Sequence, residues 1–139
     1  MAPKKTQTKK IKPQTGDLEF HLFFKSNPTP MWIYDLETLA FLQVNDAAIE
    51  KYGYTQAEFK KLTIKDIRPA EDVPALLENF NLQRSALQHS GQWRHQLKNG
   101  QVIDVEITSH TMEFEGWNSV FVMAQDITEQ KLAEEALYE

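Results

Sequence analysis

The dipeptide Asn99-Gly100 stands between two stretches of strand-forming sequence, and it limits the folds open to this chain more than any other feature. Asn-Gly in this setting is the strongest short-range signal for a β-hairpin. In residues 101–112, the apolar residues Ile103, Val105 and Ile107 alternate with polar ones. This alternation is typical of an antiparallel sheet with one buried face and one solvated face. The second half of the chain is therefore expected to form such a sheet.

Two further strands are expected in this half, at residues 92–98 and 118–126, with a turn at Glu115-Gly116 before the second. Residues 119–124 are apolar on both faces of the predicted strand. The outer face of the sheet is therefore expected to be covered there, either by a helix at residues 18–24 or by a partner subunit. The side chains proposed for this dimer interface are Leu18, Leu22, Phe23, Phe121 and Met123.

The first half of the chain predicts a flanking helix, a hairpin and then several helices. Asp17 is placed to cap a helix at residues 17–27, which ends before two prolines. β-forming residues at 31–35 and 41–45 predict a pair of strands. The first half therefore begins with a helix and a hairpin.

Helix signals follow the hairpin directly. Asn45 or Asp46 can cap a helix that Gly53 ends, and residues 55–58 form a capping box for the next one. The longest helix is expected to begin near residue 71 and to stop at Ser90-Gly91.

The net charge of −5 is the sum of two unlike parts. Residues 1–16 hold five lysines and no acidic residue, so we expect a disordered basic leader, solvated or serving as a nuclear signal or lipid-binding patch. Residues 17–139 hold ten basic and twenty acidic side chains, so no nucleic-acid partner is expected. The chain has no signal-peptide core and no apolar run near the roughly 18 residues of a membrane span, so a cytoplasmic protein is expected.

Several kinds of site are excluded by the residues present. The chain has no cysteine, so it lacks disulfides, zinc thiolates and a thiolate nucleophile. The histidines at positions 21, 89, 95 and 110 are not spaced as a metal pair on one helix face. No serine lies in a nucleophile elbow, and no glycine-rich phosphate loop is present. We therefore expect a regulatory domain without catalytic residues or a metal site.

Three motifs in sequence resemble those of the PAS sensor family. Residues 45–59 contain Asn-Asp-Ala-Ala, Tyr-Gly-Tyr-Thr and Glu-Phe in that order. Lys98-Asn99-Gly100 is similar to the family's Lys-[Asp/Asn]-Gly turn, and residues 126–131, Asp-Ile-Thr-Glu-Gln-Lys, resemble its exit motif. Each motif is weak alone, but their order and spacing are specific, and the resemblance covers about residues 18–139.

The resemblance implies an α+β fold with a five-stranded antiparallel sheet in the order 2-1-5-4-3, and with short helices and one long helix on one face. It implies a flanking helix at 17–27, a sensor domain at 28–128 and the start of a signalling helix at 129–139. It also implies a homodimer that relays a signal through Asp126, Ile127 and Thr128 to a cis effector, such as a histidine kinase or diguanylate cyclase.

A ligand pocket between the sheet and its helices is expected from this fold. No buried charge is evident in the sequence, so two alternatives remain open: a small apolar ligand, or a filled core in a ligand-free dimerisation module. The proposed lining is Tyr52, Phe59, Ile67, Leu77, Phe80, Ile103, Val105, Ile107, Val122 and Ala124.

Cofactors are a separate alternative, since some relatives are haem or flavin sensors of redox state or gases. His89 is the candidate haem ligand, although its place at the predicted end of the long helix suits a solvated histidine. Flavin adduct chemistry of the family's LOV branch needs a cysteine, which this chain lacks. Trp32, Trp93 and Trp117 are expected to be core or interface residues. No cofactor is therefore expected.

Overall fold

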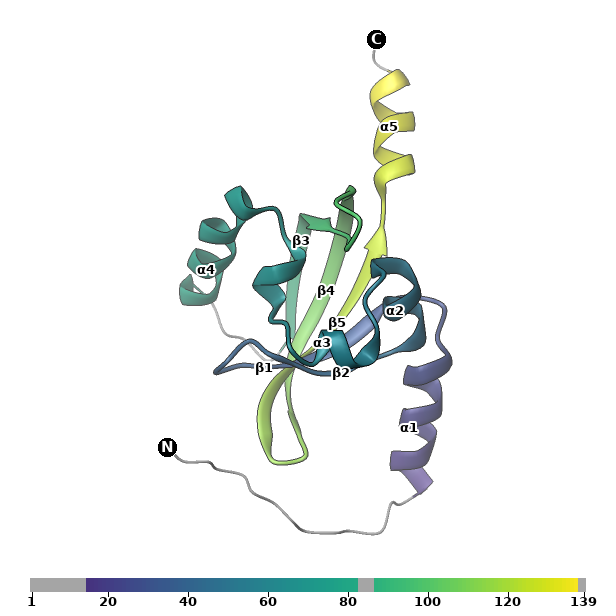
Figure 1. Cartoon of the computed structure of the whole chain (residues 1–139), viewed down its shortest axis with the longest axis vertical. Helices are drawn as coiled ribbons and strands as arrows, with labels where there is room; N and C mark the ends of the chain where they lie inside the picture. The colour runs from purple at the N-terminus through teal and green to yellow at the C-terminus, as the bar shows by residue number, and fades with distance from the viewer. Residues whose placement is uncertain (1–14, 83–86, 138–139) are drawn as a thin grey trace.

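The computed structural model describes residues 15–82 and 87–137, with side chains described for 18–78 and 91–137. Its centre is a five-stranded sheet in the order β2-β1-β5-β4-β3, in which every neighbouring pair is antiparallel (Figure 1). This confirms the α+β fold and the strand order that the sequence resemblance implies. The strands are β1 Met31–Asp35, β2 Phe41–Val44, β3 Leu87–Gln96, β4 Val102–Phe114 and β5 Trp117–Asp126.

The central strands β1 and β5 bury side chains on both faces of the sheet. Along a strand successive side chains point to opposite faces. Trp32 and Tyr34 accordingly lie in the main core, on what we call the inner face, whereas Met31 and Ile33 lie in a second cluster on the outer face. Phe121 of β5 packs against that second cluster. The expectation that the last strand is apolar on both faces because both are covered is therefore confirmed.

The helices begin and end largely where short-range signals place them. Asn45 caps α2 by accepting a hydrogen bond from the Ala48 N–H, and the capping box of Thr55 and Glu58 opens α3. A second capping box, of Thr63 and Asp66, opens η1. The helical segments are α1 Thr15–Ser26, α2 Asp46–Tyr52, α3 Gln56–Phe59, η1 Ile64–Ile67, η2 Ala70–Asp72, α4 Val73–Leu82 and α5 Thr128–Leu137.

The predicted long helix is shorter than expected. α4 ends at Leu82, and β3 begins at Leu87, so the expectation of helix up to Ser90-Gly91 is wrong. Gly91 has a φ of 87° and lies where the β3–β4 register shifts. A glycine in the left-handed region permits a β-bulge, in which one strand carries an extra residue. Gly91 therefore interrupts the regular pairing of β3 instead of ending a helix.

The turn at Asn99-Gly100 joins β3 to β4 as predicted, but it has a different form. Of its two residues only Gly100 has a positive φ, 94°. The Leu97 N–H donates to the Gln101 carbonyl at 2.8 Å, and the Gly100 N–H donates to the Leu97 carbonyl at 2.9 Å. This is a three-residue hairpin loop with glycine in the left-handed position, not the two-residue turn in which Asn-Gly is most common.

Helix α1 packs on the outer face of the sheet. Phe24 is buried there, and the Phe20 ring lies 5.8 Å from the Phe24 ring and 6.4 Å from that of Phe121 between centroids. Lys25 forms an ion pair with Asp46 at the start of α2, at 3.0 Å. Two ways of covering the outer face were expected, a helix of the same chain or a partner subunit, and the structure shows the first.

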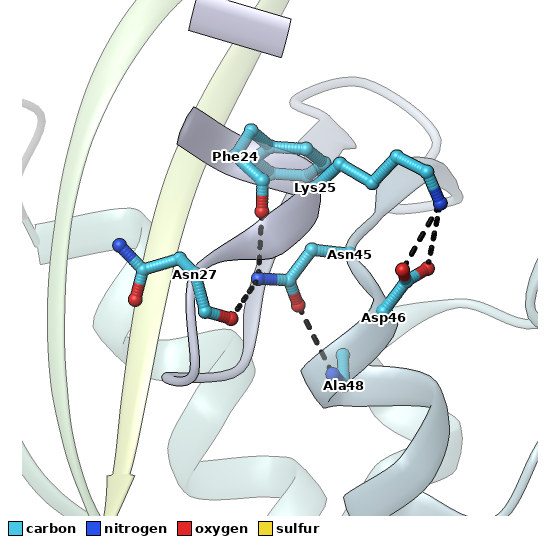
Figure 2. A network of polar contacts seen from close by, with 6 residues as sticks. All are labelled: Phe24, Lys25, Asn27, Asn45, Asp46 and Ala48. Atoms are coloured by element: carbon cyan, nitrogen blue, oxygen red, sulfur yellow. Dashed lines mark hydrogen bonds and ion pairs between the residues drawn. The ribbon is translucent and has the colours of Figure 1, made fainter. Parts of the chain in front are cut away.

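Asn45 fixes the segment between α1 and β1 to the start of α2 (Figure 2). Its side chain is buried, and both ends of the amide are used. The Oδ1 atom accepts from the N–H groups of Met31 (2.9 Å) and Ala48 (3.0 Å), and Nδ2 donates to the carbonyls of Phe24 (2.9 Å), Thr29 (3.0 Å) and Asn27 (3.4 Å). We call this group of contacts the Asn45 clamp.

Helix α5 projects away from the sheet beyond the end of β5 (Figure 1). None of its residues is buried, and Leu132 and Leu137 are exposed. In the part of the chain that the structure describes, no helix is long and apolar enough to cross a bilayer. The expected basic leader, residues 1–16, lies almost wholly outside the described residues.

Candidate functional site

A cavity of about 460 Å³ lies beside α2 at the end of the sheet from which α5 leaves. Its floor is apolar and includes side chains of β4 and β5, and its rim carries three charged residues of α2 and β5. A mostly apolar cavity with a few polar groups is the usual form of a small-molecule site. The lining is Pro28, Pro30, Ala47, Glu50, Lys51, Tyr52, Ile103, Val105, Ala124 and Asp126.

The proposed pocket residues divide into three groups. Tyr52, Ile103, Val105 and Ala124 line this cavity. Phe59, Ile67, Ile107 and Val122 are buried in the main core, in the same cluster as the first four.

Two α4 residues complete the proposed set. Leu77 is 40% exposed, because α4 turns Leu76 rather than Leu77 toward the core. Phe80 lies in α4, but its side chain is outside the described part. The expectation that Leu77 faces the core is therefore wrong.

The rim of the cavity contains a short ion pair. Lys51 Nζ of α2 lies 2.7 Å from Asp126 Oδ2 of β5, and both side chains are partly exposed. Partial burial raises the pKa of Asp126, but hydrogen bonds from Lys51 and Thr128 outweigh burial and lower it below its ordinary value. Asp126 is therefore ionised at neutral pH. Lys51 and Glu50 were not predicted as site residues, because an exposed lysine or glutamate on a helix carries no distinguishing sequence signal.

Asp126 also holds the start of α5. Its Oδ1 atom accepts from the N–H of Thr128 at 2.9 Å and from the Thr128 hydroxyl at 2.6 Å. The Thr128 Oγ1 atom in turn accepts from the N–H of Asp104 in β4 at 2.9 Å, and the buried Ile127 donates its N–H to the Asp104 carbonyl at 2.8 Å. The three residues named as the relay thus lie together at the junction of β4, β5 and α5, which we call the exit joint.

A buried polar group lies deeper in the core. The Tyr52 hydroxyl is 2.6 Å from Nδ1 of His95, which is 0% exposed. The Arg68 guanidinium lies nearby, with Cζ 5.2 Å from the centre of the Trp93 ring, and burial lowers its pKa to about 10. Arg68 as a whole is half-buried, but its Nε and Nη1 atoms are buried and so is Asp35, so the sequence expectation that no charge is buried is wrong. Arg68 follows a one-turn helix and carries no local signal of burial, whereas His95 alternates with Trp93 and Leu97, so strand periodicity places it on the inner face.

The proposed interface residues lie on two surfaces. Leu18, Leu22 and Phe23 of α1 are all more than half exposed, whereas Phe121 and Met123 of β5 are partly buried beneath α1. Phe20 and Phe24 therefore cover the sheet, while the first three residues form an apolar strip on α1 that nothing in the described structure covers.

The candidate cofactor residues are placed as follows. His89 lies in β3, so the expectation that it ends a helix is wrong, and its side chain is outside the described part. Trp32 is a core residue, as expected. Among the described side chains, no three of His, Asp and Glu are gathered so as to hold a metal ion.

Comparisons with known proteins agree with this architecture. A methyl sulfide methyltransferase-associated sensor of Methanosarcina acetivorans is 24% identical over 117 residues, which is 84% of this chain but 12% of that protein. The PAS domain of an HTR-like protein from Haloarcula marismortui superposes with a TM-score of 0.64 at 18% identity, covering 81% of this chain and 92% of that one.

A domain of a sensory box sensor histidine kinase/response regulator from Geobacter sulfurreducens superposes with a TM-score of 0.67 at 20% identity, covering 80% of this chain and 94% of that one. At these identities the likeness to solved structures shows the fold. The sequence model of the PAS domain matches residues 28–129, which is most of the chain. The chain therefore belongs to the PAS domain family.

Proposed function

We propose that this PAS domain senses a small, mostly apolar molecule in the cavity beside α2 and passes the signal through the exit joint to α5. One observation carries the proposal: Asp126 both lines the cavity and holds the first residue of α5. A molecule that displaces Lys51 from Asp126, or moves α2, changes the groups that orient α5. A few kcal/mol of differential affinity between two arrangements is enough to shift such an equilibrium.

The proposal as a whole is tested by searching for the molecule. Native mass spectrometry of gently purified protein and thermal melts against a metabolite panel are suited to this, because specific binding raises stability by RT ln(1 + [L]/Kd). A bound molecule whose affinity falls in a variant that fills the cavity, Ala124→Leu, supports the sensor. If nothing binds and Ala124→Leu leaves the protein unchanged, the domain is a ligand-free dimerisation module.

The link between the cavity and α5 can be tested by Lys51→Met. The change removes the ion pair and leaves the bonds between Asp126 and Thr128 in place. The Lys131 N–H donates to the Ile127 carbonyl at 2.9 Å in the first turn of α5, so it reports opening there. Its hydrogen exchange, measured by NMR, is expected to become about two- to fivefold faster, as the loss of a partly exposed ion pair implies.

Lys25→Met is the matched control for that experiment. Lys25 forms a similar exposed pair with Asp46, at 3.0 Å, but it joins α1 to α2 away from the exit joint. This variant should leave Lys131 exchange unchanged. Equal exchange rates in the wild type and Lys51→Met would show that the ion pair does not couple the cavity to α5.

We also propose that the domain forms a homodimer through the apolar strip of Leu18, Leu22 and Phe23. Phe23 is 58% exposed, and contiguous apolar side chains of this kind mark interaction surfaces. We expect Phe23→Glu to shift the protein from dimer to monomer in sedimentation velocity at tens of micromolar. Val102→Glu, which changes an exposed apolar residue on β4, should remain dimeric. A monomeric wild type would contradict the proposed interface.

PAS domains are regulatory modules, and no enzymatic domain is evident in this chain. We propose that α5 leads to a cytoplasmic effector domain in the same chain, such as a histidine kinase or a diguanylate cyclase. The names of two similar proteins, a methyltransferase-associated sensor and a sensory box histidine kinase, are consistent with a sensor of this kind.

A further inference from the structure

The loop between β3 and β4 contains an asparagine that is directly followed by a glycine. In such a pair the backbone nitrogen of the glycine can attack the side-chain carbonyl carbon of the asparagine, because glycine has no Cβ to hinder the approach. Asn99 is the only asparagine of the sequence that precedes a glycine. Asn99 and Gly100 are both exposed, so water reaches the groups that would react.

The fold holds the Asn99 side chain over the peptide group that would attack it. Asn99 Oδ1 accepts a hydrogen bond from the Gln101 N–H at 2.9 Å. The ring of atoms closed by this hydrogen bond includes both Cγ of Asn99 and the nitrogen of Gly100, so the two are kept close together. The N–H donor also lies at the oxygen on which negative charge develops during the attack, and such donors stabilise that charge.

One hydrogen bond opposes the reaction. The Gly100 N–H donates to the Leu97 carbonyl at 2.9 Å, and the nitrogen must lose this proton before it attacks. The bond is released by local opening of an exposed turn, which costs much less free energy than unfolding the domain. A Cβ placed on Gly100 would meet nothing within 4 Å, so the loop has open space in which to rearrange.

The other asparagines with described side chains each lack one of these conditions. Asn27 precedes a proline, which has no backbone N–H with which to attack. Asn45 is buried and uses both ends of its amide in the Asn45 clamp. Asn118 is exposed, but the next residue, Ser119, is buried within β5. Asn99 alone combines an exposed side chain with a following glycine.

We propose that Asn99 deamidates spontaneously in the folded protein, with water as the only co-reactant, and that opening of the turn limits the rate. The Gly100 nitrogen gives its proton to solvent and forms a bond to Cγ of Asn99. The bond from Cγ to Nδ2 breaks, so that ammonia leaves and a succinimide ring remains. Water then opens the ring at either carbonyl. Opening at Cγ gives aspartate, and opening at the backbone carbonyl gives isoaspartate.

The isoaspartate product changes the loop as well as its charge. The main chain then runs through the former side chain, which adds one backbone atom to a three-residue loop. Lys98 fixes this loop to the helices, because its N–H donates to the Tyr52 carbonyl at 2.9 Å and its ammonium lies 3.0 Å from the Glu58 carboxylate. A longer loop no longer fits both attachments, so we expect the isoaspartate form to have a lower Tm.

Incubation of the full chain at mildly alkaline pH in heavy-oxygen water tests the proposal. Peptide fragmentation in a mass spectrometer should locate heavy oxygen at position 99, in separate aspartate and isoaspartate products. Asn118 is the internal control, and it should react at least about tenfold more slowly, because a serine follows it and the strand holds its backbone. Absence of label at position 99, or equal labelling at positions 99 and 118, overturns the site.

Two variants test the role of the loop. Glu58→Gln removes the ion pair with Lys98 but keeps a side chain that suits the capping box of α3. The turn should then open more often, and deamidation should become about two- to fivefold faster. Lys25→Met removes a similar exposed pair away from this loop and should leave the rate unchanged. An unchanged rate in Glu58→Gln overturns the claim that opening of the turn is limiting. No outcome here involves Lys51 or Asp126, so the proposed function is tested separately.

Discussion

Asn45→Ala is expected to lower the free energy of unfolding by about 4 kcal/mol, a large share of the stability of a small domain. The alanine leaves the buried N–H groups of Met31 and Ala48 without their acceptor and three carbonyls without their donor. Loss of a helix cap alone costs about 1 kcal/mol, and each buried polar group left unpaired costs about 1–3 kcal/mol. The contacts are lost together because a single side chain makes all of them.

Urea unfolding followed by circular dichroism measures this effect. Asn99→Ala is the control, because exposed Asn99 makes one bond, to the Gln101 N–H at 2.9 Å, and its loss should cost less than about 1 kcal/mol. Asn45→Asp should lie between the two, since it keeps the acceptor and loses the donor. If Asn45→Ala unfolds at the same urea concentration as the control, the Asn45 clamp contributes little to stability.

The second large expected effect is a loss of folding stability between pH 7 and pH 5, a range in which carboxylates do not titrate. Burial and the charge of Arg68 hold the pKa of His95 well below 6.5 in the folded state, whereas the unfolded chain has the ordinary value. Below pH 6.5 the unfolded state therefore binds a proton that the folded state does not, and stability falls as pH falls. The slope is about 1.4 kcal/mol per pH unit, which gives a loss of about 2 kcal/mol between pH 7 and pH 5.

Urea titrations at pH 7, 6 and 5 measure this slope. The double variant Tyr52→Phe/His95→Leu removes the titrating group together with its partner, and it should flatten the dependence in this range. Lowered pKa values of Glu58, Asp72 and Asp126 also reduce stability in acid, but only below about pH 5. A wild type whose stability is constant from pH 7 to pH 5 would show that the fold does not lower the pKa of His95.

The features predicted correctly from the sequence are local or periodic. The cap at Asn45 and the box of Thr55 and Glu58 depend on residues three positions apart, and the alternation in residues 103–107 follows the two-residue repeat of a strand. Such features can be predicted from the sequence because they depend only on residues that are close together along the chain. The same reasoning placed Tyr52, Ile103, Val105 and Ala124 in the interior, where they line the cavity.

The features missed depend on contacts between distant parts of the chain. The hydrogen bond between Tyr52 and His95 joins α2 to β3, and the ion pair of Lys51 and Asp126 joins α2 to β5. Ser90-Gly91 fits a helix end and a β-bulge equally well, because glycine is favoured in both, and only the pairing of β3 with β4 distinguishes the two. The polar residues of the site were therefore not predicted from the sequence, whereas its apolar lining residues were.

The position of β5 in the sheet also determines the order in which the domain can be assembled. The pairings of β1 with β2 and of β3 with β4 join neighbours along the chain, whereas β1 also pairs with the distant β5, in a register that joins Met31 to Met123. Closing that long loop carries the largest entropy cost and makes this pairing a slow step of folding. The strand that closes the sheet is also the one that leads into α5. A newly synthesised chain therefore cannot position α5 correctly until β5 has joined the sheet.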